Sequence, residues 1–244
     1  YKDIYLKTSI DPRYKYWFEL KEKESYKTMI TRSFFRDLHS RRLPEVGKKR
    51  FQWKRNVSVL ELGFGIHCFG INLLINQYNL NPKGLYGIEA SDIAIANAKK
   101  ISPQSNFYKV DYGPDQLIKL LDFWIEKGIT FNVIMARYFL EGFENHEEIV
   151  SRIKKLLKPI NTETLKVRGI FALTTKSFGS EDLFIVNNRS TRSKQYGQRA
   201  IKWEEGSWAI LLNGQELEVY DSIRQFSETY TLGYETVTFA RRIN

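Results

Sequence analysis

The chain has 244 residues, a formal net charge of +10, and 42% hydrophobic and 14% aromatic residues. This composition excludes a disordered chain, and the length suffices for one large α/β domain with its own core, with or without a small appendage. No apolar run reaches the roughly 18 residues that cross a bilayer, and the single cysteine, Cys68, excludes an internal disulfide. We therefore expect a cytoplasmic protein.

The segment 1–56 carries nearly all of the excess positive charge. It holds 16 Lys and Arg against 7 Asp and Glu, and the remainder of the chain is close to neutral. Apolar residues recur there every four positions with basic residues between them, which predicts an amphipathic helix. The apolar positions are Tyr26, Ile30, Phe34 and Leu38. We interpret this segment either as a helical basic lid that attracts an anionic substrate, with His39 as a contact, or as a solvated helix face.

The segment 57–74 predicts a buried strand, a tight turn and the start of a helix. An apolar run ends in Glu61, Gly63 and Gly65 follow, and a second apolar segment begins. Glycine has no Cβ, so its backbone adopts positive φ easily and a ligand can approach it closely. The start of the next helix presents unpaired N–H groups and a positive dipole end. We therefore expect a polar or anionic ligand group at this turn.

Two further strands are each followed by an acidic residue. Glu89 follows the strand expected at 84–88, and Asp111 follows the strand expected at 106–110. Because parallel strands end at the same edge of a sheet, we expect these carboxylates and the glycine turn to project from one edge. A carboxylate at the end of the second strand accepts hydrogen bonds from ribose hydroxyls in nucleotide-binding βαβ units. The pattern therefore predicts a nucleotide-like ligand.

The rest of the chain continues the alternation of strands and helices. Ser91 is expected to cap a helix, and Gly128 is expected to end the helix that Pro114 begins. Asn213-Gly214 is a turn signal for a hairpin. The expected elements are helices at 93–100, 114–127, 149–157 and 221–231, strands at 131–136, 169–175 and 234–241, and a hairpin over 203–220. This order predicts a doubly wound α/β domain over 57–244.

The stretch from Val57 to Lys176 resembles the Rossmann-like, class I S-adenosylmethionine-dependent methyltransferases, nearest their small-molecule branch. The resemblance rests on the Glu-Leu-Gly-Phe-Gly turn, the two acidic strand ends and a Leu-Lys-Pro ending of the helix near 157–159. It implies a mostly parallel sheet of the seven-stranded type, S-adenosylmethionine as cofactor and S-adenosylhomocysteine as product. The cofactor residues that it implies are Glu61, Gly63, Phe64, Gly65, His67, Glu89, Ala90, Asp111, Tyr112 and Ala136.

One position departs from the family pattern. The family writes its turn with a third glycine where this chain has His67. His67 either lines the site and shifts the ligand or caps the first turn of the helix. A nicotinamide dinucleotide enzyme would need its third glycine one residue later, where this chain has Cys68, so the dinucleotide interpretation is weaker.

Few residues are available for catalysis. Methyl transfer needs an aligned nucleophile and, where required, a group that removes its proton. His146 is suited by the near-neutral pKa of histidine, and Tyr138 and Glu141 are further candidates. Arg137 and Tyr138, at the expected end of the fourth strand, are candidate substrate contacts. The spacing of His, Asp and Glu predicts no metal site.

We expect transfer of a methyl group to an oxygen or nitrogen atom of a small or medium-sized acceptor. The acceptor is expected to be anionic if the basic segment 1–56 meets, above the pocket, a second basic cluster formed by Arg189, Arg192, Lys194, Arg199 and Lys202. One alternative is an RNA or protein methyltransferase that docks through residues 1–56. Another is a methyltransferase-like scaffold without catalysis. Amine methylation of bases is disfavoured because Ala136-Arg137-Tyr138-Phe139 lacks the required prolines. The oligomeric state is not predicted.

Overall fold

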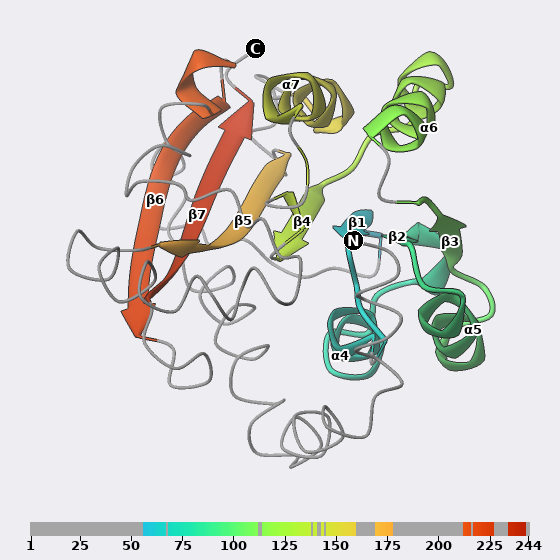
Figure 1. The fold of residues 1–244 in the computed structure, drawn as a ribbon. Coiled ribbons are helices and arrows are strands. Elements are labelled where there is room, and N and C mark those ends of the chain that lie inside the picture. The colour runs from blue at the N-terminus through green and yellow to red at the C-terminus, as the bar shows by residue number, and fades with distance from the viewer. Residues whose placement is uncertain are drawn as a thin grey trace, which may run out of the picture. The chain divides into compact units, whose positions relative to one another are not determined.

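The computed structural model describes residues 56–66, 68–111, 114–137, 139–140, 143, 145–159, 169–177, 212–215, 217–226 and 234–242. The basic helix expected within residues 1–56 lies outside the described residues. The first strand of the hairpin expected over 203–220 also lies outside them. The same holds for five predicted site residues: His39, His67, Tyr112, Tyr138 and Glu141. The chain falls into two compact units, of which the first ends at Lys109 and the second begins at Val110 (Figure 1).

The first unit holds three parallel strands in the order β3-β2-β1. All four residues of β1 are buried. Three of them are apolar and the fourth is Glu61, and such an apolar run is typical of a buried parallel strand. Glu61 on β1 lies opposite Gly87 on β2 in the register of the sheet. The elements are β1 (Val59–Leu62), α4 (Phe69–Asn76), the 3-10 helix η2 (Pro82–Gly84), β2 (Leu85–Glu89), α5 (Asp92–Ile101) and β3 (Asn106–Lys109).

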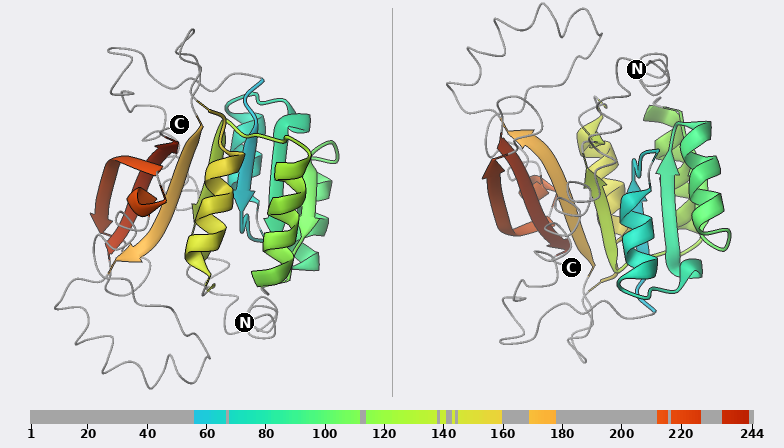
Figure 2. Two further views of the ribbon diagram at one scale, coloured as in Figure 1. Left: turned by 90° about the horizontal axis from the view of Figure 1, so that it is seen from above. Right: turned by 90° about the horizontal axis from the view of Figure 1, so that it is seen from below.

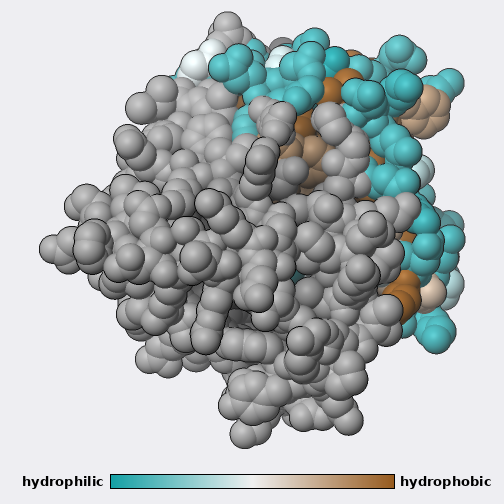
Figure 3. Space-filling model, in the orientation of Figure 1, coloured by the Kyte–Doolittle hydropathy of each residue, from teal (hydrophilic) through white to brown (hydrophobic). Residues whose placement is uncertain are grey.

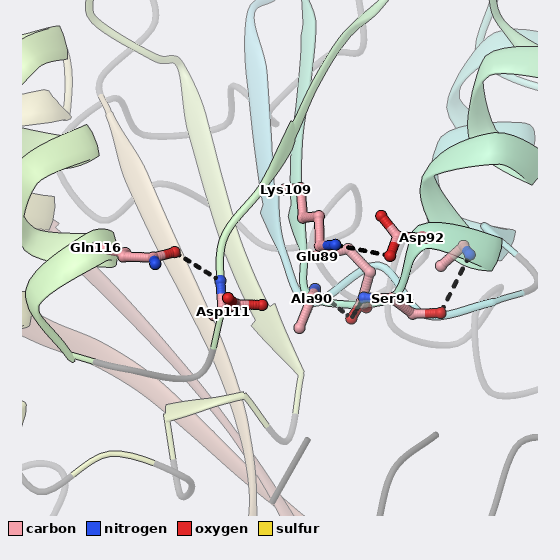
Figure 4. A network of polar contacts seen from close by, with 8 residues as sticks. Glu89, Ala90, Ser91, Asp92, Lys109, Asp111 and Gln116 are labelled. Carbon is pink, nitrogen blue, oxygen red and sulfur yellow. Dashed lines mark hydrogen bonds and ion pairs between the residues drawn. The ribbon is translucent and has the colours of Figure 1, made fainter. Parts of the chain in front are cut away.

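Helix α5 begins as the sequence predicts. The Ser91 Oγ accepts a hydrogen bond from the Ala94 N–H at 3.3 Å, which satisfies one of the free donors of the first turn. Asp92 lies in the first turn, where its negative charge is favourable, and forms a 2.6 Å ion pair with Lys109 at the end of β3 (Figure 4). Ala94 and Ala98 are fully buried. The start of α5 is therefore capped by its own serine and linked to the end of β3 by an ion pair at the surface.

The second unit holds four strands in the order β4-β5-β7-β6. The β4 and β5 strands are parallel, whereas β7 pairs antiparallel with both β5 and β6. Figure 2 shows β5, β7 and β6 side by side as long strands. The elements are α6 (Pro114–Glu126), β4 (Val133–Arg137), α7 (His146–Leu156), β5 (Ile170–Ser177), β6 (Leu217–Phe226) and β7 (Tyr234–Arg242).

Helix α6 packs on Phe131, which lies just before β4, and is joined to α7 by an ion pair. Trp124 and Phe131 are both fully buried, and their rings meet edge to face at 5.8 Å between centroids. Arg152 Nε on α7 donates to Asp122 Oδ1 on α6 at 2.8 Å. Gly128 adopts a φ of 67° after α6, as expected of a glycine that ends a helix.

Two predictions for the last third of the chain are wrong. Residues 221–226 belong to strand β6, whereas the sequence predicted a helix over 221–231. A register shift between Val219 and Asp221 breaks the period of two that would have identified the strand. Residues 212–214 form a helical turn with no positive φ, so Asn213-Gly214 is not the predicted type I′ turn, and β6 pairs with β7 instead.

On the face that Figure 3 shows, the described residues that reach the surface are mostly hydrophilic, with some hydrophobic residues between them. The large hydrophobic side chains that are exposed are Ile93, Ile101 and Phe123. The ammonium group of Lys127 lies 5.7 Å from the centroid of the Phe123 ring. Among the described residues, no helix is both long and apolar enough to span a membrane.

Candidate functional site

The glycine turn between β1 and α4 has the backbone that its sequence predicts. Gly63 and Gly65 have φ values of 71° and 68°, in the left-handed region that favours glycine. The Gly63 N–H donates to the Ile88 carbonyl at 2.9 Å, which ties the turn to the end of β2. Among the described residues, a Cβ atom placed on Gly65 would meet nothing within 4 Å. The turn therefore has an open side at Gly65, where a ligand can approach the main chain.

Glu89 at the end of β2 binds this turn directly. Its Oε2 accepts a hydrogen bond from the Gly65 N–H at 2.9 Å. Its Oε1 accepts from the N–H groups of Ala90 at 2.7 Å and Ser91 at 3.4 Å, as Figure 4 shows. A carboxylate offers about four lone-pair sites, two on each oxygen. Three of these sites are filled, so Oε2 retains one acceptor site for a ligand hydroxyl.

The ionised form of Glu89 is disfavoured by its burial. The residue is only 1% exposed, and this burial raises the pKa of its carboxyl above the ordinary 4.5. The three backbone hydrogen bonds lower the pKa without cancelling the effect of burial, and the nearby Glu61 raises it further. A ligand hydroxyl that donates to Oε2 would favour the ionised form.

Glu61 on β1 lies against the first turn of α4. Its carboxylate is 1% exposed and packs on Gly70, whose Cβ position would lie 2.6 Å from Oε1 and 2.8 Å from Cδ. A negative charge beside the N-terminus of a helix is stabilised by the helix dipole. Gly70 is therefore the residue that admits the Glu61 carboxylate to the start of the helix, a role that sequence reasoning missed.

Phe64 points away from the open side of the turn. It is 3% exposed, and its ring lies on Gly87, where any Cβ would clash with it. The ring also meets Phe107 at 5.4 Å between centroids. The Phe64 side chain therefore packs the turn onto β2 and β3, and only its main chain is placed to meet a ligand.

Cys68 directly precedes α4 and is fully buried. Its φ of 50° lies in the left-handed region, which is unusual for a residue other than glycine. Burial, followed by the charges of Glu61 and Glu89, raises the pKa of the thiol to about 12. Because the thiol stays protonated near neutral pH, Cys68 serves as a packed side chain and not as a nucleophile.

Asn97 is a further contact to the turn that the sequence did not single out. From α5, its Nδ2 donates to the Ile66 carbonyl at 3.2 Å. The Cys68 thiol also lies near this carbonyl, with its Sγ 3.7 Å away. No local sequence signal identifies such a contact, because it joins residues 31 positions apart.

Four of the predicted site residues that the structure describes belong to the second unit: Asp111, Ala136, Arg137 and His146. Ala136 is fully buried within β4, and Arg137, at the end of that strand, is half-buried. The Asp111 N–H donates to Gln116 Oε1 at 3.0 Å at the start of α6 (Figure 4).

His146 begins α7 and is 5% exposed. Its Nε2 lies 2.9 Å from the Leu140 carbonyl oxygen, and since a carbonyl only accepts, Nε2 carries the proton. Burial lowers the pKa of the ring, so the neutral form is favoured. The hydrogen bond links the start of α7 to Leu140, and because Nε2 carries the proton, the basic nitrogen of the neutral ring is Nδ1.

The structure thus brings Glu61, Gly63, Gly65, Glu89 and Ala90 together around one turn of the first unit. Among the described residues, no group of three or more His, Cys, Asp or Glu side chains could hold a metal ion.

Comparisons with known proteins show similarity in structure only. No family model matches the chain, and no curated protein matches it in sequence. The 1,6-didemethyltoxoflavin-N1-methyltransferase of Burkholderia thailandensis matches with a TM-score of 0.56 and 15% identity, over 98% of this chain and 88% of that chain. The magnesium protoporphyrin IX methyltransferase of Synechocystis PCC 6803 gives a TM-score of 0.53 and 15% identity, over 77% and 74% of the two chains.

A third match is a SAM-dependent methyltransferase of Methanosarcina mazei, with a TM-score of 0.52 and 13% identity over 78% of this chain and 93% of that one. At sequence identities this low, the matches show a shared fold and nothing more. The chain therefore has the Rossmann-like fold of class I methyltransferases, as the sequence predicted.

Proposed function

We propose that this chain is an S-adenosylmethionine-dependent methyltransferase that acts on an oxygen or nitrogen atom of a small or medium-sized acceptor. The observation that carries the proposal is the pairing of Gly65 with Glu89. A left-handed glycine with an open side lies 2.9 Å from a buried carboxylate that retains one acceptor site. This arrangement suits a ligand with a ribose and a polar chain.

The residues of the first unit fit the cofactor in their chemistry. Glu89 would accept a hydrogen bond from one ribose hydroxyl at Oε2, and the Gly63 to Gly65 turn would receive the methionine part along its open side. Glu61, near the start of α4, would lie near the positive amino group of that part. Bound S-adenosylmethionine supplies a methyl group on a positive sulfonium. The chain then has to align the acceptor and exclude water.

Two of the matched structures contain S-adenosylhomocysteine, which supports this assignment. The Burkholderia thailandensis enzyme was crystallised with 1,6-didemethyltoxoflavin and S-adenosylhomocysteine, and the Synechocystis enzyme with S-adenosylhomocysteine. The first of these enzymes acts on a ring nitrogen by its name. A small heterocyclic acceptor is accordingly the first class of compound to test with this chain.

Asp111 would bind the adenine amino group, with Tyr112 and Ala136 as further contacts, as the family resemblance implies. Arg137, Tyr138 and His39 would contact the acceptor. Tyr138, Glu141 and His146 remain the candidates for proton removal, and His146 would act through Nδ1, because its Nε2 proton is held by the Leu140 carbonyl. These roles are proposals that mutation has to test.

The test is transfer of label from methyl-labelled S-adenosylmethionine to pooled small heterocycles, to RNA and to protein, each in separate reactions with the purified chain. We expect label in a small-molecule product. Label only in RNA or protein would replace the acceptor class. A folded chain that binds neither S-adenosylmethionine nor S-adenosylhomocysteine would instead favour the non-catalytic scaffold.

A further inference from the structure

Two side chains that bind the glycine turn come from one short segment, 89–97. Glu89 Oε2 accepts from the Gly65 N–H at 2.9 Å, and Asn97 Nδ2 donates to the Ile66 carbonyl at 3.2 Å. Gly65 and Ile66 are neighbours in the chain. The two ends of the segment therefore hold two consecutive residues of the turn, one through its donor and the other through its acceptor.

The segment between these two contacts is itself well fixed. The Glu89 Oε1 accepts from the N–H groups of Ala90 and Ser91, and the Ser91 Oγ accepts from the Ala94 N–H. From there to Asn97 the chain is the regular helix α5, with Ala94 fully buried. The distance between the Glu89 carboxylate and the Asn97 amide is thus set by one capped helix start.

The turn needs such support. Cys68 adopts a φ of 50°, and left-handed backbone costs a residue other than glycine about 1–2 kcal/mol. The Cys68 Sγ lies 3.7 Å from both the Ile66 and Ala94 carbonyls. The left-handed residue thus lies next to α5. Of the two side chains near the Ile66 carbonyl, Asn97 makes the shorter contact, 3.2 Å against 3.7 Å for the Cys68 thiol.

We propose that Asn97 is a positioning residue, which holds the glycine turn against α5 so that the Gly65 N–H and the Glu89 carboxylate stay in the geometry that receives the cofactor. This inference rests on the proposed function for the identity of the ligand. The hydrogen bonds of Glu89 and Asn97 to the turn, here called the clamp, are present without a ligand. Asn97 acts through the turn and does not touch the bound molecule.

The test compares the wild type with Asn97→Ala and Asn97→Asp. Alanine favours helix, so α5 should remain intact, and aspartate keeps the shape while removing the donor. Asn76→Ala is the matched control, because Asn76 is an exposed helical asparagine whose Nδ2 donates to Asn72. The first readout is amide hydrogen exchange of Gly65 in the ligand-free protein, measured by NMR.

We expect both Asn97 variants to speed exchange at Gly65 roughly fivefold, as the loss of one hydrogen bond allows, while amides of α6 and of the Asn76→Ala control stay unchanged. S-adenosylhomocysteine should bind the Asn97 variants more weakly by a similar factor. Unchanged exchange at Gly65 would overturn the clamp whether or not the chain binds the ligand. If the wild type does not bind S-adenosylhomocysteine but the Asn97 variants still exchange faster at Gly65, Asn97 positions the turn and the proposed function is rejected.

Discussion

The carboxylate of Glu61 occupies the space that a side chain on Gly70 would need. A Cβ at position 70 would lie 2.6 Å from Glu61 Oε1, a separation that real Cβ atoms do not show. Glu61 is 1% exposed, so its carboxylate has little room to move aside. The first turn of α4 can therefore pack against the end of β1 only because residue 70 has no side chain.

This fit predicts that Gly70→Ala destabilises the protein, although alanine normally stabilises a helix by about 0.5–1 kcal/mol relative to glycine. We expect a loss of about 1–3 kcal/mol in the free energy of unfolding, as for an overpacked core. Gly214→Ala is the control, because position 214 also lies in a helical turn and its Cβ would meet nothing within 4 Å. Denaturant unfolding of both variants measures the difference.

A double-mutant cycle identifies Glu61 as the cause. In a Glu61→Ala background the space beside Gly70 is empty, so adding Gly70→Ala should cost nothing or stabilise slightly. Equal costs of Gly70→Ala in the two backgrounds would show that the destabilisation has another source.

Glu89 predicts opposite effects of pH on ligand binding and on stability. Burial raises its pKa above 4.5, so the ligand-free fold favours the protonated form and this group's contribution to stability is lost as pH rises through the raised pKa. A ribose hydroxyl donates to the ionised form, so affinity for S-adenosylhomocysteine should rise over the same window.

Calorimetric titrations with S-adenosylhomocysteine at several pH values above 4.5, on the wild type and on Glu89→Gln, separate this effect from other titrations. We expect the variant to bind at least tenfold more weakly at neutral pH, since a hydrogen bond to a charged group contributes about 1.5–3 kcal/mol, and to show a flatter pH profile. A variant with wild-type affinity and the same profile would place the ribose elsewhere.

Cys68 should be inert in the folded protein. Because burial and two carboxylates raise the pKa of its thiol to about 12, almost no thiolate exists at pH 8. The chain has one cysteine, so a colorimetric thiol reagent at pH 8 should give no signal from the native protein and one equivalent after unfolding. Rapid labelling of the native protein would contradict the described position of Cys68.

The same shift has a consequence for stability at alkaline pH. A thiol whose folded pKa lies above its unfolded value stabilises the fold below about pH 9, and this contribution is lost as pH rises from 9 toward 12. The stability of the wild type should therefore fall relative to that of Cys68→Ala over this range. Parallel curves for the two proteins would show that the thiol is not buried.

The sequence predicted those parts of the fold and site whose signals are local. Ser91 as a helix cap, Gly63 and Gly65 with positive φ, and Glu89 at the end of β2 are each visible in a few consecutive residues and are all found in the structure. The helix predicted over 221–231 was wrong because β6 is specified by its pairing with β7, which is not a local property.

The contacts that shape the turn were beyond sequence reasoning for the same reason. Phe64 was expected as a cofactor residue, but Gly87 on β2 leaves the space that its ring fills. Neither Asn97 nor Gly70 carried a signal in the sequence that set it apart. Each of these roles depends on a partner more than eight positions away, which only the folded chain reveals.

The most direct test of the proposed function concerns the open side of Gly65. Gly65→Ala adds one methyl group where nothing lies within 4 Å, at a φ of 68°. Gly128→Ala is a matched control, since Gly128 has a φ of 67° and an equally empty Cβ position after α6. Both changes should cost about 1–2 kcal/mol of stability through left-handed backbone.

Calorimetric titration with S-adenosylhomocysteine, after bound nucleoside has been removed, distinguishes the two positions. We predict that the wild type and Gly128→Ala bind one equivalent in the micromolar range and that Gly65→Ala binds at least tenfold more weakly. Equal affinity of Gly65→Ala and the wild type, or no binding by a folded wild-type chain, would contradict a cofactor site at this turn.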